Sequence, residues 1–177
     1  EQKERLADFF DQNTIDQRLS TAVENLRKLQ RGDGSWSWWP DMAGSPYMTT
    51  AVTELLVRLN AMTSQQSETK QMLSKAFDFL GNDIVELVNE MKKQEKKGIK
   101  QYFPSHRALV WLYLCTTDGR QLPAKVTEAN NYLTNLLKKD PRNQTIYEKA
   151  LSAIVLKNKT YVKSLKEWTV YREEMGR

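Results

Sequence analysis

The sequence predicts an all-α protein, and three observations carry that prediction. Apolar residues recur at the three- and four-residue spacing of a helix, no segment alternates apolar and polar residues as a strand does, and only seven glycines and five prolines interrupt the 177 residues. Hydrophobic residues make up 40% of the chain, which is enough to build a core, and the length is that of one domain. We therefore expect a single helical domain over residues 1–177.

Eight helices are expected, over residues 3–11, 15–29, 47–62, 67–91, 106–115, 123–139, 144–157 and 160–174. The second helix has one apolar stripe, made of Leu19, Ala22, Val23, Leu26 and Leu29. The third has another, made of Ala51, Val52, Leu55, Leu56 and Leu59. The fourth begins near Ser67, whose hydroxyl is a suitable N-cap, and Gly81 bends this helix without ending it.

The later helices carry clearer start signals. Ser105 is a suitable N-cap for the fifth helix, whose residues are apolar nearly all round, so we expect that helix to be buried. Pro123 suits the first turn of the sixth helix, because the N–H that proline lacks would have no intrahelical partner there. The last two helices are predicted from helical apolar spacing alone.

An alanine followed four residues later by a large apolar residue recurs through the chain. The pairs are Ala22/Leu26, Ala51/Leu55, Ala76/Leu80, Ala108/Leu112, Ala129/Leu133 and Ala150/Ile154. Each pair lies on one helix face, where the alanine lets a neighbouring helix approach closely. The intervals between pairs are irregular, which excludes a fixed helical repeat and favours stacked antiparallel hairpins of unequal length.

Composition excludes several classes of function. The net charge is +5, but basic and acidic residues are interleaved along the chain, so we expect no nucleic-acid partner. The longest apolar run, residues 108–115, is far shorter than a membrane-spanning helix, so we expect no direct membrane insertion. One cysteine and one histidine cannot form a four-ligand zinc site, and we expect neither metal nor cofactor.

The segment with the most unusual composition is LQRGDGSWSWWP, over residues 29–40, where three of the five tryptophans fall within four residues. Asp33-Gly34 inside it is a strong turn signal. The candidate binding residues of this region are Trp36, Trp38, Trp39 and Tyr47. One interpretation is a stacking platform for sugars, bases or an aromatic ligand. The other, which we favour, is that the indoles fold back and bond helix-terminal carbonyls.

LQRGDGSWSWW resembles a motif that recurs in α/α-toroid proteins, which include triterpene cyclases, protein prenyltransferase β-subunits and the thioester domain of α-2-macroglobulin and complement proteins. In that motif the glutamine and the first tryptophan tie adjacent helices together, which implies a structural role for Gln30 and Trp36. The fold that this resemblance implies is part of an (α/α) toroid. The chain lacks both the Asp-x-Asp-Asp acid of the protonating cyclases and the zinc ligands of the prenyltransferases.

The remaining landmarks resemble bacterial α-2-macroglobulin-like proteins of the Bacteroidetes type. These landmarks are EQKERLADFFDQN, DGSWSWWPDMAGSPYMTTAVTELLVRL, AFDFLGNDIVELVNEMKKQEKK, HRALVWLYL and YEKALSAIVLKNKTYVKSLKEWTVYREEMGR, in that order. Active relatives form a thioester within a Cys-x-Glu-Gln motif, but Cys115 is followed by Thr-Thr-Asp. The family layout implies that the thioester motif lies upstream of Glu1, so we expect the chain to be the downstream part of that domain and a fragment of a larger multidomain protein.

The resemblance implies a scaffold segment of a protease-trapping endopeptidase inhibitor, with no enzymatic chemistry of its own. The implied partners are other domains of the same parent chain, and proteinases through the parent. The implied location is the periplasm, or the periplasmic or extracellular side of a membrane through an anchor elsewhere in the parent. Two alternatives stay open: an α/α-toroid enzyme acting on carbohydrate, and a helical-repeat module that binds peptide or glycan.

Two further residues could in principle carry chemistry. His106 follows Ser105 at a helix start, and no nucleophile motif identifies a partner for it, so we interpret it as structural or solvent-exposed. Cys115 belongs to an apolar helix, where a free cysteine usually packs in the core.

Overall fold

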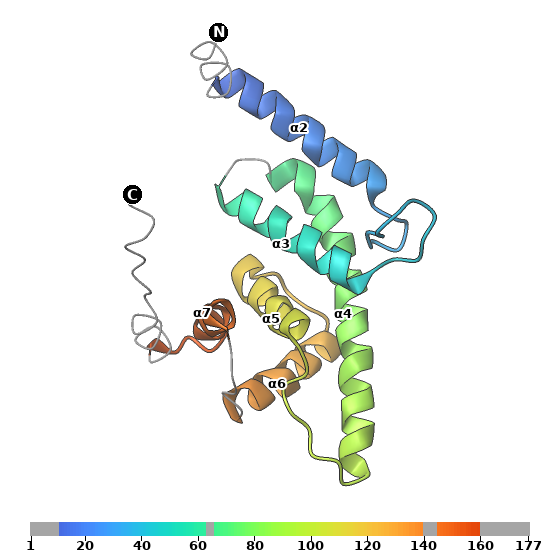
Figure 1. The fold of residues 1–177 in the computed structure, drawn as a ribbon, viewed down its shortest axis with the longest axis vertical. Coiled ribbons are helices and arrows are strands. Elements are labelled where there is room, and N and C mark those ends of the chain that lie inside the picture. Colours follow the sequence, from blue (N-terminus) through green and yellow to red (C-terminus); the bar gives the residue numbers. More distant parts are fainter. Residues whose placement is uncertain (1–10, 63–65, 140–144, 160–177) are drawn as a thin grey trace, which may run out of the picture. The chain divides into compact units, whose positions relative to one another are not determined.

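The structure, a computed structural model of the 177-residue chain, describes residues 11–62, 66–139 and 145–159. Its helices are α2 (Gln12–Leu29), α3 (Pro46–Met62), α4 (Gln66–Lys96), α5 (His106–Asp118), α6 (Ala124–Lys139) and α7 (Ile146–Val155) (Figure 1). The described ranges contain no strand, so the all-α prediction is confirmed. The closure of these helices into an (α/α) toroid stays a prediction.

The two terminal helices that the sequence predicts, over 3–11 and 160–174, lie outside the described residues apart from Asp11. Asp11 is the N-cap of α2, because its Oδ2 accepts a hydrogen bond from Thr14 N at 2.8 Å. This cap starts α2 three residues before the predicted Ile15. The predicted cap at Ser67 is wrong, since α4 begins at Gln66 and Ser67 lies within its first turn.

The chain forms two compact units, Glu1–Phe79 and Leu80–Arg177, and the boundary falls within α4. The expectation of a single domain over 1–177 stays a prediction.

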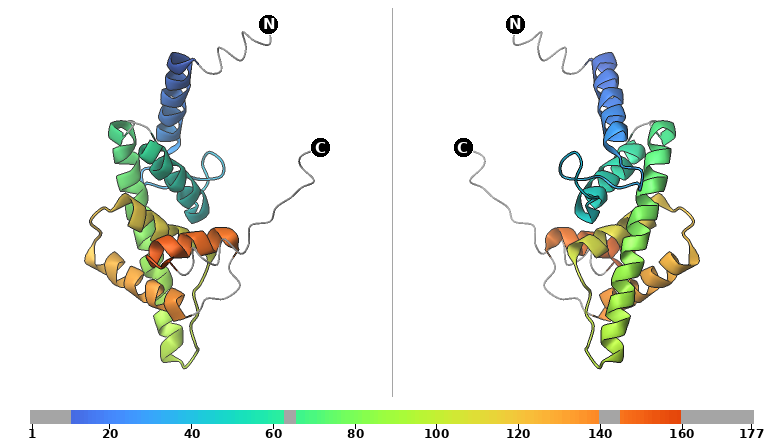
Figure 2. Two further views of the ribbon diagram at one scale, coloured as in Figure 1. Left: turned by 90° about the vertical axis from the view of Figure 1, so that its left-hand side faces the viewer. Right: turned by 90° about the vertical axis from the view of Figure 1, so that its right-hand side faces the viewer.

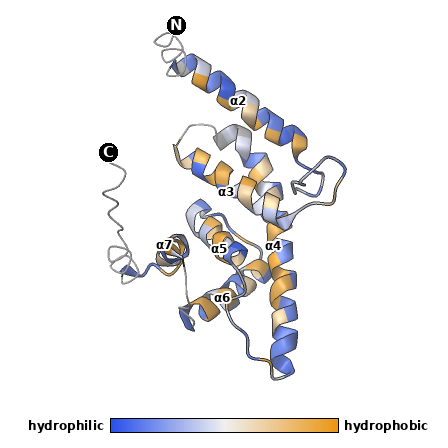
Figure 3. Ribbon diagram, in the orientation of Figure 1, coloured by the Kyte–Doolittle hydropathy of each residue, from blue (hydrophilic) through white to orange (hydrophobic). Residues whose placement is uncertain are grey.

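The first unit contains α2, α3 and the first part of α4, and Figure 2 shows α3 beside that part of α4. Its buried apolar residues are Val23, Trp36, Leu56, Val57, Met72, Leu73, Ala76 and Phe77. Figure 3 shows that α2 is largely hydrophilic, and Val23 is the one described α2 residue in the buried core. This helix therefore contributes little core packing of its own.

Three threonines of α3 are buried in the first unit, and each hydroxyl donates to the backbone carbonyl four residues earlier. Thr49 donates to Ser45 O at 2.8 Å, Thr50 to Pro46 O at 2.7 Å and Thr53 to Thr49 O at 2.6 Å. A buried hydroxyl without a partner would cost free energy, so these bonds let the polar side of α3 pack inward.

The second unit is built around α5, which packs against α7 and α6. The predicted burial of this helix is confirmed, because Ala108, Leu109, Val110, Trp111, Leu112 and Leu114 are all buried. Trp111 Nε1 donates to Asn130 Oδ1 of α6 at 2.7 Å. A Cβ added at Gly81 would lie 3.1 Å from Val126 Cγ2, so the glycine lets α6 approach α4, which continues through this position as expected.

The helix ends follow capping rules. Ser105 accepts from Ala108 N and caps α5 as predicted, and Gly119 ends that helix with a φ of 69°. Helix α6 begins one residue after Pro123, whose carbonyl accepts from Thr127 N. Thr145 forms a capping box with Glu148 at the start of α7.

Only some of the alanine pairs meet a neighbouring helix. Ala76/Leu80, Ala108/Leu112 and Ala129/Leu133 are buried, as the pattern predicts. Leu55 and Ile154 are 57% and 46% exposed, so no helix in the described part of the chain covers their pairs. The face of α3 that carries Leu55 is therefore open surface in the first unit.

Candidate functional site

The loop from Gln30 to Ser45 joins α2 to α3, and its first part is a tight turn. Asp33 Oδ1 accepts hydrogen bonds from Ser35 N at 3.0 Å and Ser35 Oγ at 2.6 Å. These bonds lower the pKa of Asp33: the Ser35 hydroxyl contributes most, then the Ser35 amide. The turn closes through Gly34 N to Arg31 O at 3.0 Å and Arg31 N to Ser35 O at 2.9 Å. The turn predicted at Asp33-Gly34 is present.

Two glycines let the loop backbone pack closely. Gly34 has a φ of +88°, and a Cβ added there would lie 2.2 Å from Lys75 O of α4. A Cβ added at Gly44 would lie 1.9 Å from Ser35 Oγ. The loop is thus seated directly against α4 and against itself, which explains why both positions carry glycine.

Trp36 is buried, at 2% exposure, and fastens the loop to two helices. Its Nε1 donates to Leu26 O, in the last turn of α2, at 2.9 Å. Its backbone N–H donates to Thr49 Oγ1 at 3.0 Å, and its carbonyl accepts from Ser45 N at 2.9 Å. The contact that the structural interpretation predicts, an indole N–H on a helix-terminal carbonyl, is present for this tryptophan.

Gln30 makes the link that the sequence motif implies. Its Nε2 donates to Gly34 O at 3.0 Å and to Met72 O at 2.9 Å. One side chain therefore joins the end of α2, the turn and α4. Beside it, Arg31 Nη1 donates to Met42 O at 2.6 Å and holds the far side of the loop.

Trp38, Trp39 and Tyr47 do not fold inward; they are 55%, 68% and 61% exposed. Trp38 stacks on Tyr47, with ring centroids 5.7 Å apart and planes within 11°. Met42 and Leu55 are also exposed, and Leu55 lies about two helical turns after Tyr47 in α3. We call these five residues, Trp38, Trp39, Met42, Tyr47 and Leu55, the aromatic surface.

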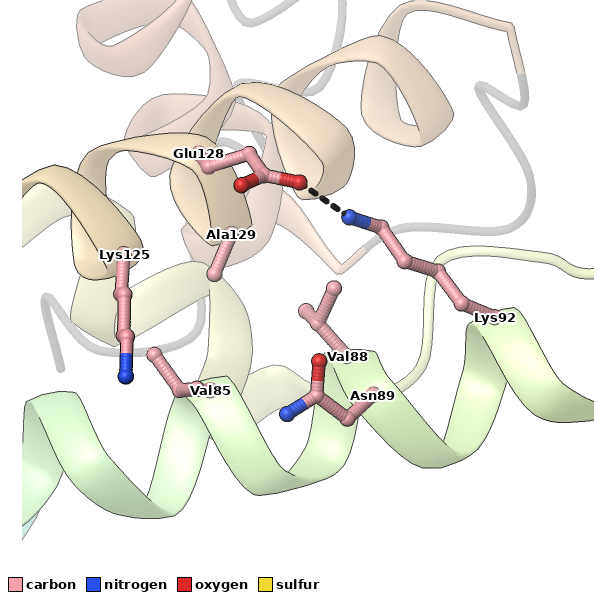
Figure 4. Close-up of a pocket in the computed structure, with 7 residues that line it drawn as sticks. All are labelled: Val85, Val88, Asn89, Lys92, Lys125, Glu128 and Ala129. Atoms are coloured by element: carbon pink, nitrogen blue, oxygen red, sulfur yellow. Dashed lines mark hydrogen bonds and ion pairs between the residues drawn. The ribbon is translucent and has the colours of Figure 1, made fainter.

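A groove of about 280 Å³ lies between α4 and α6 in the second unit (Figure 4). Its lining residues are Val85, Val88, Asn89 and Lys92 of α4, and Lys125, Glu128 and Ala129 of α6. Lys92 Nζ lies 2.6 Å from Glu128 Oε1, and this hydrogen bond lowers the pKa of Glu128. Lys125 has no ion pair or hydrogen bond among the described residues. The groove therefore combines an apolar floor with one unpaired ammonium.

Sequence reasoning missed this groove. The α4 residues Val85, Val88, Asn89 and Lys92 follow the i, i+3, i+4, i+7 spacing of one helix face, which is a readable signal. The pattern does not say which helix lies opposite, and that depends on the approach of α6 at Gly81.

The two residues considered for chemistry are placed in supporting positions. His106 Nδ1 lies 3.2 Å from Glu148 Oε1, while Glu148 Oε2 caps α7. Burial alone would raise the pKa of Glu148, but its bonds with Thr145 and His106 outweigh that and lower it. Burial raises the pKa of Cys115 to about 12, so at neutral pH it is an un-ionised thiol.

Within the described ranges no group of three or more histidine, cysteine or acidic side chains could hold a metal ion. No described helix is long and apolar enough to cross a membrane. The chain matches no family model, no curated protein and no solved structure.

Proposed function

We propose that this chain is a non-enzymatic scaffold segment of an α-2-macroglobulin-like protease-trapping protein, and that its aromatic surface contacts another domain of the same parent chain. The observation that carries the contact is the exposure of Trp38, Trp39 and Tyr47 on a loop that is itself firmly held. The family part of the proposal rests on the sequence resemblance, which also supports a periplasmic or membrane-anchored parent.

The chemistry of the aromatic surface supports a protein partner. Trp38, Trp39, Met42, Tyr47 and Leu55 expose indole, phenol, thioether and branched aliphatic groups on one unit, each more than 45% exposed, and Trp38 stacks on Tyr47. Contiguous exposed apolar patches usually mark protein contacts, and aromatic residues and methionine are enriched in such interfaces. A rigid loop presents this area at little entropic cost on binding.

The two residues considered for chemistry, Cys115 and His106, are otherwise engaged. The Cys115 thiol stays protonated at neutral pH, and the carboxylate nearest His106 caps a helix. This supports a segment without nucleophilic chemistry at Cys115 or a free general base at His106.

The stacked pair of Trp38 and Tyr47 favours one second candidate, a noncovalent glycan-binding module. Exposed flat rings are suitable surfaces for the C–H faces of sugars. This candidate differs from the first in its ligand, since it predicts binding to carbohydrate by the isolated chain.

The test uses the parent protein with Trp38→Ala and Trp39→Ala combined. A trapped proteinase still cleaves a small peptide substrate but no longer cleaves a large protein substrate. The readout is the ratio of the two cleavage rates. We expect the wild-type parent to show this protection and the double variant to lose most of it. Intact mass after methylamine treatment, with labelling of free thiols, tests for an upstream thioester.

The matched control is Ile99→Ala, which removes an exposed apolar side chain from the second unit. A wild-type parent that leaves cleavage of the large substrate unchanged would overturn protease trapping. Full protection by the double variant would overturn the contact surface. Loss of binding to a glycan array by the double variant, with protection intact, would favour the glycan-binding module.

A further inference from the structure

We propose that the groove between α4 and α6 binds the C-terminal residue of a peptide, with the carboxylate at Lys125 and an apolar side chain on the valine floor. This binding site is independent of the proposed contact of the aromatic surface. The charge, the lining and the size of the groove support it.

Of the charged side chains that line the groove, only Lys125 has no partner of opposite charge among the described residues. Lys92 and Glu128 are 2.6 Å apart and neutralise each other, and Lys92 also lies over the ring of Tyr132 at 5.7 Å. Figure 4 shows this pair across one end of the groove and Lys125 beside Val85 at the other. Lys125 lies in the first turn of α6, where the positive end of the helix dipole adds to its charge. The groove is therefore complementary to a ligand with a single negative charge.

The floor of the groove is apolar and fixed in shape. Val88 and Ala129 are 2% and 3% exposed, so the core holds them in place, and Val85 is half-buried beside them. β-Branched valines have restricted rotamers, which keeps the floor preformed. Val85 supplies most of the apolar surface that a branched aliphatic side chain, such as that of leucine, would cover, because Val88 and Ala129 are already almost fully buried.

The size of the groove sets the length of chain that it admits. Its volume of about 280 Å³ lies just below the roughly 300–1,000 Å³ of typical small-molecule sites, which suits one terminal residue with its carboxylate. Asn89 also lines it, and no hydrogen bond in the described part of the chain uses its side-chain amide. That amide offers a donor and an acceptor for one peptide group, which favours a peptide terminus over a free carboxylic acid.

The test is a methyl and amide NMR titration of the full chain with the peptide acetyl-Gly-Gly-Leu. We expect shifts at Val85 and Val88, with a dissociation constant in the millimolar range. The same peptide with an amidated C-terminus removes the negative charge and should bind about fivefold more weakly, as expected for an exposed ion pair. Lys125→Gln should weaken the acid peptide by the same factor and leave the amidated peptide unchanged.

Lys138→Gln is the matched control, because Lys138 is an exposed lysine on the same helix outside the groove lining. Absence of shifts at Val85 and Val88 would overturn the proposal, as would equal binding of the acid and amidated peptides. Equal weakening by Lys138→Gln would show that net charge, rather than Lys125, attracts the peptide. Isocaproate, which has the leucine-like stem without a peptide group, should bind more weakly; equal binding would overturn the assignment to a peptide terminus.

Discussion

Both arms of the tryptophan loop carry tryptophan, but the structure buries one arm and exposes the other. In the inner arm, residues 30–36, Trp36 is 2% exposed and bonds α2, while Gln30 bonds α4. In the outer arm, residues 37–42, Trp38 and Trp39 are more than half exposed. The difference shows that a tryptophan cluster is not one functional unit: the inner arm holds the loop in place, and the outer arm presents a surface.

Replacing Trp36 with alanine should give the largest effect. The change removes a buried indole and leaves a cavity, and it also strips Leu26 O of its donor, so the free energy of unfolding should fall by about 3–5 kcal/mol. Urea unfolding followed by far-UV circular dichroism measures it. Trp38→Ala, the matched change in the outer arm, should cost under about 1 kcal/mol. Equal losses for the two variants would abolish the distinction between the arms.

Gly34→Ala should have the next largest effect, because alanine there would be strained in two ways. It would hold a φ of +88° and place a Cβ 2.2 Å from Lys75 O, so we expect a loss of about 2–4 kcal/mol in unfolding free energy. Gly98→Ala is a close control, since Gly98 has a φ of +83° but no atom within 4 Å of an added Cβ. That variant should lose only about 1–2 kcal/mol. A Gly98→Ala loss as large as that of Gly34→Ala would show that contact with α4 adds nothing.

Gln30→Ala should produce a smaller loss, about 1–2 kcal/mol, because two carbonyls lose a shared donor. The control is Gln101→Ala, whose Nε2 bonds only the nearby Ile99 O on the surface. This control should change the unfolding free energy by less than about 0.5 kcal/mol. Hydrogen exchange at Gly34 and in the first part of α4 gives a local readout. Unchanged exchange there in Gln30→Ala would contradict a tie between the loop and α4.

Much of the fold followed from the sequence because helical periodicity and capping act over short distances. The bounds of α3 differ by one residue from the prediction, and Ser105 caps α5 as expected. Asp11 was missed as a cap because it precedes a polar first turn, where no apolar spacing marks the start of the helix. Ser67 was mistaken for a cap because serine is a common N-cap residue, but this serine lies inside the first turn of α4 rather than before it.

The candidate site was less predictable, since it depends on distant pairings. The motif indicated that Gln30 and Trp36 are structural, but the composition of the loop suggested that all three indoles fold inward, which is wrong for Trp38 and Trp39. The separation of Trp36 from Trp38 follows from Gly34 and Gly44, whose close approaches to Lys75 and Ser35 set where the loop turns outward. The groove between α4 and α6 depends on the approach at Gly81, which local patterns do not encode.

The smallest expected effect on the free energy of unfolding comes from the charge of Asp33 in the inner arm. The pKa of Asp33 is lowered by its bonds from the Ser35 hydroxyl and amide, so the ionised form is favoured in the folded state. Its contribution to stability is therefore full above the unfolded pKa of about 3.9 and is lost as the pH falls through the lower folded value. The difference in unfolding free energy between wild type and Asp33→Asn should be largest near neutral pH and shrink below pH of about 4. Asp41→Asn removes a carboxylate from the outer arm instead, and an identical pH profile for that variant would show that the inner turn gains no special stability from its charge.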